Sequence, residues 1–481
     1  MFISVLKLLP RHALRRHCEE RSDAAIQRDV STSQLFFKKS GLPRRPKGLL
    51  AMTTLCVFVG FTTQAHAAIE VKTTRISHGV KAWYAEANQV PVVDIQLSFE
   101  GAGYASDPAG KEGRAALAAA MLTQGAGNLD ALAFQRALDD GALQLSAEVS
   151  ADRLTIHLHA LRDQAKRGSE LLTIALAQPK FAPADLAREK TTLTARLAQL
   201  KETPDYQASR LFDSHAFAGH PYANPPYGSA ESLAALSADD LREYLTTYAT
   251  RGNVMVAAAG DVDDGLLDEM LQPVIEALHE GDAATPIASA AFKSAETLRQ
   301  PMAVPQTVVQ FAAPTIARDD PKFYAVYLMN HILGGSSLVS RLADHVRQQK
   351  GLVYGIDSEI DVLRGIPLLR GEFATRNATA EEAVAEVKRT ISELREKGAT
   401  TEECADAKTY VIGSSALRLD SSQQVAGMLM TMQIHRLGED YLEKRESLFQ
   451  SVTCTDINTA AREWLDPAKF LFVMVGGENK P

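Results

Sequence analysis

The sequence predicts an α+β protein made of two related halves. One order of elements occurs twice along the chain: a strand, a glycine-rich loop, a helix, further strands, paired helices and a final strand. Between the two occurrences, residues 283–291 are mostly small and include a proline, as is typical of inter-domain linkers. A chain of 481 residues is long enough for two or three domains. We therefore expect a first half over residues 68–282 and a second half over residues 292–481.

The first half shows these elements most clearly. Residues 92–99 alternate apolar and polar side chains, which predicts a strand. Residues 101–110 hold glycines and a proline and predict a loop. The alanine-rich residues 112–122 favour a helix. Two more strands are expected at residues 154–161 and 253–262.

Residues 1–67 do not resemble a domain. Residues 44–47 are basic, residues 48–63 carry no charge, and Ala65, His66 and Ala67 form a cleavage signal of the A-x-A type. This is the pattern of a secretory signal peptide, so we expect a periplasmic protein that begins near Ala68. An uncleaved membrane anchor is the alternative. Residues 16–27 resemble a translated genomic repeat, so we expect the true start to lie downstream of Met1, at Met52 or at an upstream alternative start codon.

The charge distribution separates this leader from the rest of the chain. Residues 1–67 contain eleven Lys or Arg and four Asp or Glu, a net charge of +7. Because the whole chain carries −8, the remainder carries −15. An acidic body without a basic patch disfavours nucleic acid as a partner. No phosphate-binding loop, dinucleotide fingerprint or nucleophile elbow is present in the sequence either.

Only Cys404 and Cys454 remain after the leader. An oxidising compartment would allow them to form a disulfide, but sequence alone cannot show that they are close. We favour free, buried thiols and leave the pairing open. Since no C-x-x-C motif occurs, a thiolate zinc site is not expected.

The predicted helix at residues 112–122 carries the frame of a metal motif. Glu112, Gly113 and Met121 match the phrase E-G-x-A-H-x-x-E-H-M. This resembles the pitrilysin/insulinase zinc peptidases, the inverzincins, whose motif is H-x-x-E-H. The slots for the two histidines and the glutamate base fall at i, i+3 and i+4, on one helical face. Those slots are occupied here by Ala116, Ala119 and Ala120.

The resemblance implies a third zinc ligand, a glutamate on a later helix. That slot falls on Arg196, or on Ala195 if the register is shifted by one residue. Zinc needs nitrogen, sulfur or oxygen donors, and alanine offers none while arginine would repel the cation. We therefore expect this chain to hold no zinc and to have no catalytic residue. The family also implies two halves, each an antiparallel-type sheet covered by helices, closing as a clamshell around a cleft.

The second half resembles the family more closely. Residues 332–355 closely match the phrase L-G-G-x-x-x-S-R-L-x-x-x-V-R-x-x-x-G-L-x-Y, with one additional residue before S-R-L. The resemblance implies that Arg347 and Tyr354 form a substrate-binding pair, since a guanidinium donates planar, bidentate hydrogen bonds and a phenol adds one donor. Gly334 and Gly335 form a glycine-rich loop that permits a tight turn or a close backbone approach. A helix residue in solvent and a sheet residue are the plainer alternatives for Arg347 and Tyr354.

A second candidate for metal binding is weaker. His157 and His159 alternate on one strand, so both face the same side of the sheet. No carboxylate pattern accompanies them, and we do not expect a metal there.

Two functions follow from the resemblance. The first is a non-catalytic, peptide-binding subunit of a heteromeric zinc metallopeptidase, as in heterodimers related to the mitochondrial processing peptidase. Zinc would then be held by a catalytic paralogue, and no membrane would be involved unless the signal segment is retained. The alternative is a catalytically dead scaffold, like the core subunits of the bc1 complex. The intact Arg347 and Tyr354 favour the first.

Overall fold

A computed structural model describes residues 69–282, 287–288, 290–293, 296–336, 338–362, 366–415 and 419–477. The predicted signal peptide and most of the predicted linker lie outside these residues. The described residues belong to one compact unit.

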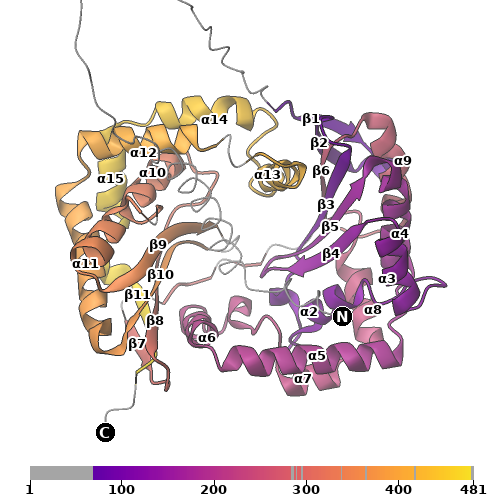
Figure 1. Cartoon of the computed structure of the whole chain (residues 1–481), viewed down its shortest axis with the longest axis horizontal. Helices are drawn as coiled ribbons and strands as arrows, with labels where there is room; N and C mark the ends of the chain where they lie inside the picture. The colour runs from indigo at the N-terminus through magenta and orange to yellow at the C-terminus, as the bar shows by residue number, and fades with distance from the viewer. Residues whose placement is uncertain are drawn as a thin grey trace, which may run out of the picture. The chain divides into compact units, whose positions relative to one another are not determined.

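The first sheet has six strands in the order β1-β2-β6-β3-β5-β4 (Figure 1). Strands β2 and β6 run parallel, and every other neighbouring pair is antiparallel. The strands are β1 (Lys72–Arg75), β2 (Lys81–Glu86), β3 (Val92–Glu100), β4 (Gln144–Val149), β5 (Arg153–Leu161) and β6 (Val254–Gly260). The strands expected at residues 92–99, 154–161 and 253–262 are therefore confirmed as β3, β5 and β6.

The second sheet has five strands in the order β7-β11-β8-β10-β9. Its strands are β7 (Thr297–Gln300), β8 (Gln306–Pro314), β9 (Val353–Val362), β10 (Pro367–Arg376) and β11 (Leu471–Val475). One parallel pair, β7 with β11, is again followed by antiparallel pairs. This is the order of the first sheet without β1, so the α+β fold with two related halves is confirmed.

Helices occupy most of the remaining described chain. Those of the first half are α2 (Arg114–Met121), α3 (Ala131–Asp140), α4 (Ala165–Ala177), α5 (Pro183–Lys201), α6 (Pro204–Ala216), α7 (Ala230–Ala235), α8 (Ala238–Tyr248) and α9 (Asp264–Ala277). Those of the second half are α10 (Phe323–Leu333), the π-helix η5 (Ala343–Gln349), α11 (Ala380–Lys397), α12 (Thr401–Gly413), α13 (Ser422–Ile434), α14 (Tyr441–Gln450) and α15 (Cys454–Trp464). Among the described residues, none of these helices combines the length and the apolar character needed to cross a membrane.

Alternation along the strands creates two different faces on each sheet. In β5, Leu154, Ile156, Leu158 and Ala160 are buried in the core beneath the helices of the first half, whereas His157 and His159 lie on the opposite face. A half-buried strand with one apolar face alternates in this way because successive side chains point to opposite sides.

The two halves exchange one helix each. Helix α6 belongs to the first half in sequence but packs on β8 and β11 of the second sheet. Helix α13 belongs to the second half but packs on β2, β3 and β6 of the first sheet (Figure 1). The apolar contacts join Phe212 of α6 to the second sheet and Leu429 of α13 to the first. Each sheet therefore has one face covered by the other half.

Candidate functional site

Helix α2 begins at Arg114, two residues after the start of the metal-motif frame. Gly113, immediately before it, has φ +90°, and a Cβ there would come within 2.7 Å of the Tyr227 carbonyl oxygen. Asp107 caps the helix, because its carboxylate accepts hydrogen bonds from the backbone N–H groups of Gly113 (2.9 Å) and Ala115 (3.1 Å). The positive φ and the crowded backbone both require glycine at position 113. This part of the motif frame is therefore explained by backbone geometry and needs no catalytic role.

The buried side of α2 carries a polar cluster. Arg114 is 3 % exposed, lies 3.6 Å from the Asp107 carboxylate, and stacks its guanidinium over Tyr244 and Tyr248 at 5.5 and 5.7 Å. Burial raises the pKa of Asp107 to about 6, although the Ala115 N–H and the Arg114 charge oppose the shift. This cluster anchors α2 against α8.

The opposite side of α2 carries the three motif slots. Ala116 and Ala120 are partly exposed and Ala119 is 8 % exposed. Arg196 on α5, the slot of the third ligand, holds its guanidinium 5.0 Å from the centre of the Tyr227 ring. Three methyl groups and a cation stacked on a phenol supply no donor for Zn²⁺, so these residues do not fit the metal that the motif holds elsewhere in the family. Within the described parts of the chain, no three side chains of His, Cys, Asp or Glu are grouped as a metal site would require.

The structure brings Arg347 and Tyr354 together. Arg347 lies near the end of η5, and its guanidinium is 5.6 Å from the centre of the Tyr354 ring. Tyr354 lies on β9, the edge strand of the second sheet, and is 85 % exposed. A guanidinium stacked on an aromatic ring can still use its in-plane N–H groups as hydrogen-bond donors.

Gly334 and Gly335 follow α10 and close its last turn. The backbone N–H groups of both glycines donate to the Asn330 carbonyl at 2.9 and 2.8 Å. A Cβ on Gly334 would lie 2.3 Å from Ser358 Oγ, and one on Gly335 would lie 2.6 Å from His331 Cα. Both positions therefore need a residue without a side chain.

His157 and His159 are held by separate carboxylates. His159 Nδ1 lies 2.9 Å from Asp94 Oδ1, and His157 Nε2 lies 3.5 Å from Glu148 Oε1. Asp94 also accepts a hydrogen bond from Ser422, the first residue of α13. The Asp94 carboxylate therefore joins the first sheet to helix α13. The contact between His159 and Asp94 is explained by this structural role.

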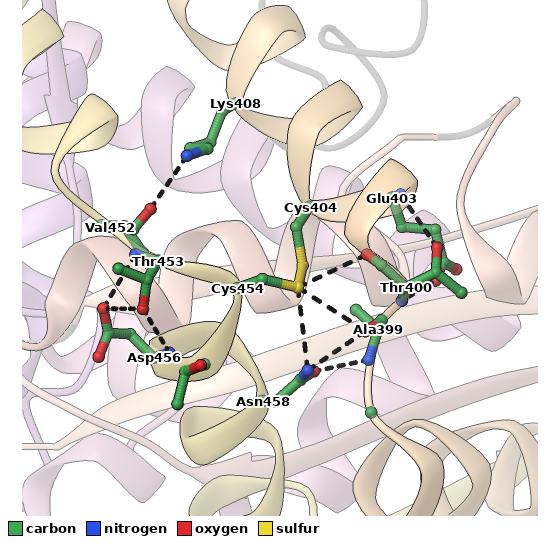
Figure 2. Close-up of a disulfide and its surroundings, with 12 residues drawn as sticks. Ala399, Thr400, Glu403, Cys404, Lys408, Val452, Thr453, Cys454, Asp456 and Asn458 are labelled. Atoms are coloured by element: carbon green, nitrogen blue, oxygen red, sulfur yellow. Dashed lines mark hydrogen bonds between the residues drawn. A yellow bond between two sulfur atoms is a disulfide. The ribbon is translucent and has the colours of Figure 1, made fainter.

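The expectation of free thiols is wrong. Cys404 and Cys454 form a disulfide with their Cα atoms 5.6 Å apart, which links the first turns of α12 and α15 (Figure 2). The two residues are 50 positions apart, so their closeness depends on how the helices pack.

Arg341 was not among the site residues predicted from the sequence. It belongs to the S-R-L part of the second-half phrase, and its Nε and Nη2 donate to both carboxylate oxygens of Glu403 at 2.7 and 2.8 Å. The phrase marked this arginine as part of the motif but could not identify a partner 62 residues away.

Comparisons with known proteins agree with this geometry. The family model "Insulinase (Peptidase family M16)" matches residues 83–229, and "Peptidase M16 inactive domain" matches residues 235–411. A "Non-peptidase homolog YmxG" of Helicobacter pylori is 29 % identical over 374 residues, which cover 77 % of this chain and 85 % of that protein. An "Uncharacterized zinc protease YmxG" of Bacillus subtilis is 22 % identical over 63 % of this chain and 73 % of its own length.

Solved structures show the same fold. A peptidase M16 inactive domain from Pseudomonas fluorescens has a TM-score of 0.80 and 28 % identity, and covers 86 % of this chain and 100 % of its own. A chain of complex III2 from Candida albicans has a TM-score of 0.70 at 18 % identity, over 84 % of this chain and 96 % of its own, which shows the fold alone. With both models matching in sequence order and alanine at the metal and base positions, the chain belongs to the insulinase (peptidase M16) family as a catalytically inactive member.

Proposed function

We propose that this chain is the non-catalytic, peptide-binding subunit of a heteromeric zinc metallopeptidase. The observation that carries the proposal is the pair Arg347 and Tyr354, which are adjacent and accessible while the metal slots on α2 hold alanine. The active zinc would belong to a paralogous partner chain that keeps H-x-x-E-H.

The chemistry of the pair suits an extended peptide. A guanidinium can donate two parallel hydrogen bonds to a carboxylate or approach a backbone carbonyl in its plane. The Tyr354 hydroxyl supplies another donor on a rigid ring. β9 is an edge strand, and such a strand can pair with an extended segment through its outer backbone groups, although those of Ser358 already bond Gly334 and Asn330.

The disulfide supports the proposed periplasmic location. Disulfides persist in the bacterial periplasm and are rare in reducing compartments. N-terminal sequencing of the native protein tests the export proposal. A mature end near Ala68 is expected, and one upstream of Arg44 would contradict a cleaved signal peptide.

A scaffold role is the second candidate. The chain from complex III2 shares the fold, and alanine at the motif slots suits a structural subunit. The two candidates differ in what Arg347 should do, since a scaffold has no use for a peptide-binding arginine.

The deciding experiment mixes this chain with a family member that carries H-x-x-E-H and measures cleavage of a labelled peptide library. A charge-assisted hydrogen bond contributes about 1.5–3 kcal/mol, so Arg347→Ala should slow cleavage by roughly tenfold to a hundredfold. Arg347→Lys should slow cleavage as well, because an ammonium cannot donate two parallel hydrogen bonds in one plane. Tyr354→Phe isolates the contribution of the hydroxyl.

Gel filtration of each mixture separates binding of peptide from assembly of the complex. Arg299→Ala is the matched control, since Arg299 pairs with Glu381 on the same half but away from β9. If Arg347→Ala leaves assembly and cleavage rate unchanged, the scaffold role takes the place of the peptide-binding role.

A further inference from the structure

The disulfide fixes the start of α12 to the start of α15. Cys404 is 2 % exposed and lies in the first turns of α12, while Cys454 is the first residue of α15 (Figure 2). The turn before α12 is fixed to the same helix by Asn458, whose amide oxygen accepts from the Ala399 N–H at 2.6 Å and whose amide nitrogen donates to the Ala399 carbonyl at 3.2 Å. The first turn of α12 is thus held by a covalent bond and by two hydrogen bonds.

Glu403, the neighbour of Cys404, has two roles in this turn. Its carboxylate accepts from the Thr400 N–H at 2.7 Å, while the Thr400 hydroxyl accepts from the Glu403 N–H, which makes a capping box. The same carboxylate receives both hydrogen bonds from Arg341, and Arg341 also donates to the Gly398 carbonyl at 2.8 Å. Arg341 is therefore fixed to the part of α12 that the disulfide holds.

Arg341 lies two residues before the helix η5, which carries Arg347. A cavity of about 590 Å³ is lined by residues 339–341, 344 and 345 and by the facing ends of α11 and α12. Leu342 and Val346 are buried in the core of the second half, while polar contacts hold the cavity side of this segment to α12. Besides Arg341, His345 contacts Thr390 on α11, with its Nδ1 3.1 Å from Thr390 Oγ1.

We propose that the Cys404–Cys454 disulfide and the Arg341–Glu403 ion pair act together to position Arg347 beside Tyr354. This inference rests on the proposed function, because it assigns Arg341 as a positioning residue for the peptide-binding pair. Without the disulfide, the first turn of α12 loses its covalent anchor to α15, and Glu403 no longer holds Arg341 in a fixed place. A site that depends on this bond binds peptide best when the chain is oxidised.

Two measurements on the full chain test the proposal. The first is hydrogen exchange over residues 342–354, which reports the order of the segment without any ligand. The second is the binding of a fluorescein-labelled library of random twelve-residue peptides, followed by anisotropy. We compare the wild type with Cys404→Ser/Cys454→Ser, Arg341→Met and the reversed pair Arg341→Glu/Glu403→Arg.

We expect faster exchange over residues 342–354 in the serine variant and in Arg341→Met, with partial recovery in the reversed pair. Peptide affinity should fall about three- to tenfold in the first two, which is less than the tenfold to hundredfold loss expected for Arg347→Ala, because Arg347 is displaced and not removed. Treating the wild type with a phosphine reductant should reproduce the serine variant, which covers the case in which that variant fails to fold. Arg299→Met, which removes a bidentate pair on the same half, should change neither measurement.

The outcomes separate the two proposals. If Arg347→Ala binds the library as the wild type does, the proposed function fails, while a change in exchange at residues 342–354 would still support the positioning. If Arg347→Ala loses binding but the serine and Arg341 variants match the wild type in both measurements, the positioning inference is overturned and the proposed function stands.

Discussion

Helix α2 and the segment from η5 to β9 contain the two stretches that resemble family motifs, and they differ in their exposed side chains. On α2 the buried side keeps a polar cluster around Arg114, while the outer side holds only alanine at the motif slots. On the second segment the partly exposed Arg347 and the exposed Tyr354 are both present. The contrast indicates that the buried face stabilises helix α2. The zinc ligands and the catalytic base of the family can therefore be replaced by alanine without loss of the helix. The contrast also shows that packing does not explain an 85 % exposed tyrosine.

The largest expected effect comes from rebuilding the motif. We expect the wild type to hold no stoichiometric zinc, and Ala116→His, Ala119→Glu, Ala120→His combined with Arg196→Glu to hold about one zinc per chain, because the four changes restore three ligands and the base. Elemental analysis after dialysis against a weak chelator measures both. The variant that keeps Arg196 is the control and should bind at least roughly tenfold more weakly, since its cation repels the metal. One tightly held zinc in the wild type would show that the metal-free assignment is wrong.

A smaller effect distinguishes the two sides of α2. Arg114→Met should lower the free energy of unfolding by about 3–5 kcal/mol, because it leaves the buried Asp107 carboxylate without its cation. Ala120→Ser on the outer side should change it by about 0.5 kcal/mol or less. Urea denaturation at pH 7.5 measures both. Equal losses would mean that the buried cluster does not anchor the helix.

The exchanged helix α13 gives a pH-dependent test of how the halves are joined. Burial, with the nearby charges of Arg318 and Arg153, lowers the pKa of His435 at the end of α13 to about 4. The unfolded chain therefore binds this proton near pH 6.5 while the folded chain does not, so stability falls as the pH drops from about 6.5 to 4. The expected loss is about 3 kcal/mol. In His435→Leu this part of the pH dependence should be missing, and an unchanged profile would exclude His435 as its source.

The smallest expected effect on stability belongs to the peptide-binding pair. Tyr354→Ala should change the free energy of unfolding by about 0.5 kcal/mol or less, because its ring is mostly in solvent. Its binding of the labelled peptide library should nevertheless fall as it does for Arg347→Ala. A stability loss above about 2 kcal/mol would assign Tyr354 to the fold instead of the site.

The local pattern was enough to predict the strands β3, β5 and β6, and the motif frame predicted the helix α2 and the pair Arg347 and Tyr354. Alternation placed β3 to within one residue, while α2 begins two residues later than expected because Gly113 takes a positive φ before it. The disulfide and the Arg341–Glu403 pair could not be predicted from the sequence, because they join residues 50 and 62 positions apart. The exchange of α6 and α13 was equally hidden, because an amphipathic helix shows that it will be covered but not by which sheet.

The exchanged helices also determine what would happen if the backbone were cut in the linker. Each fragment would carry a helix whose natural sheet is on the other fragment, and each would leave one face of its own sheet bare. Neither piece should persist alone, yet the two should remain associated after a single cleavage and should reassemble when produced as separate polypeptides. The two fragments would then depend on each other for folding, so removal of one fragment would unfold the other.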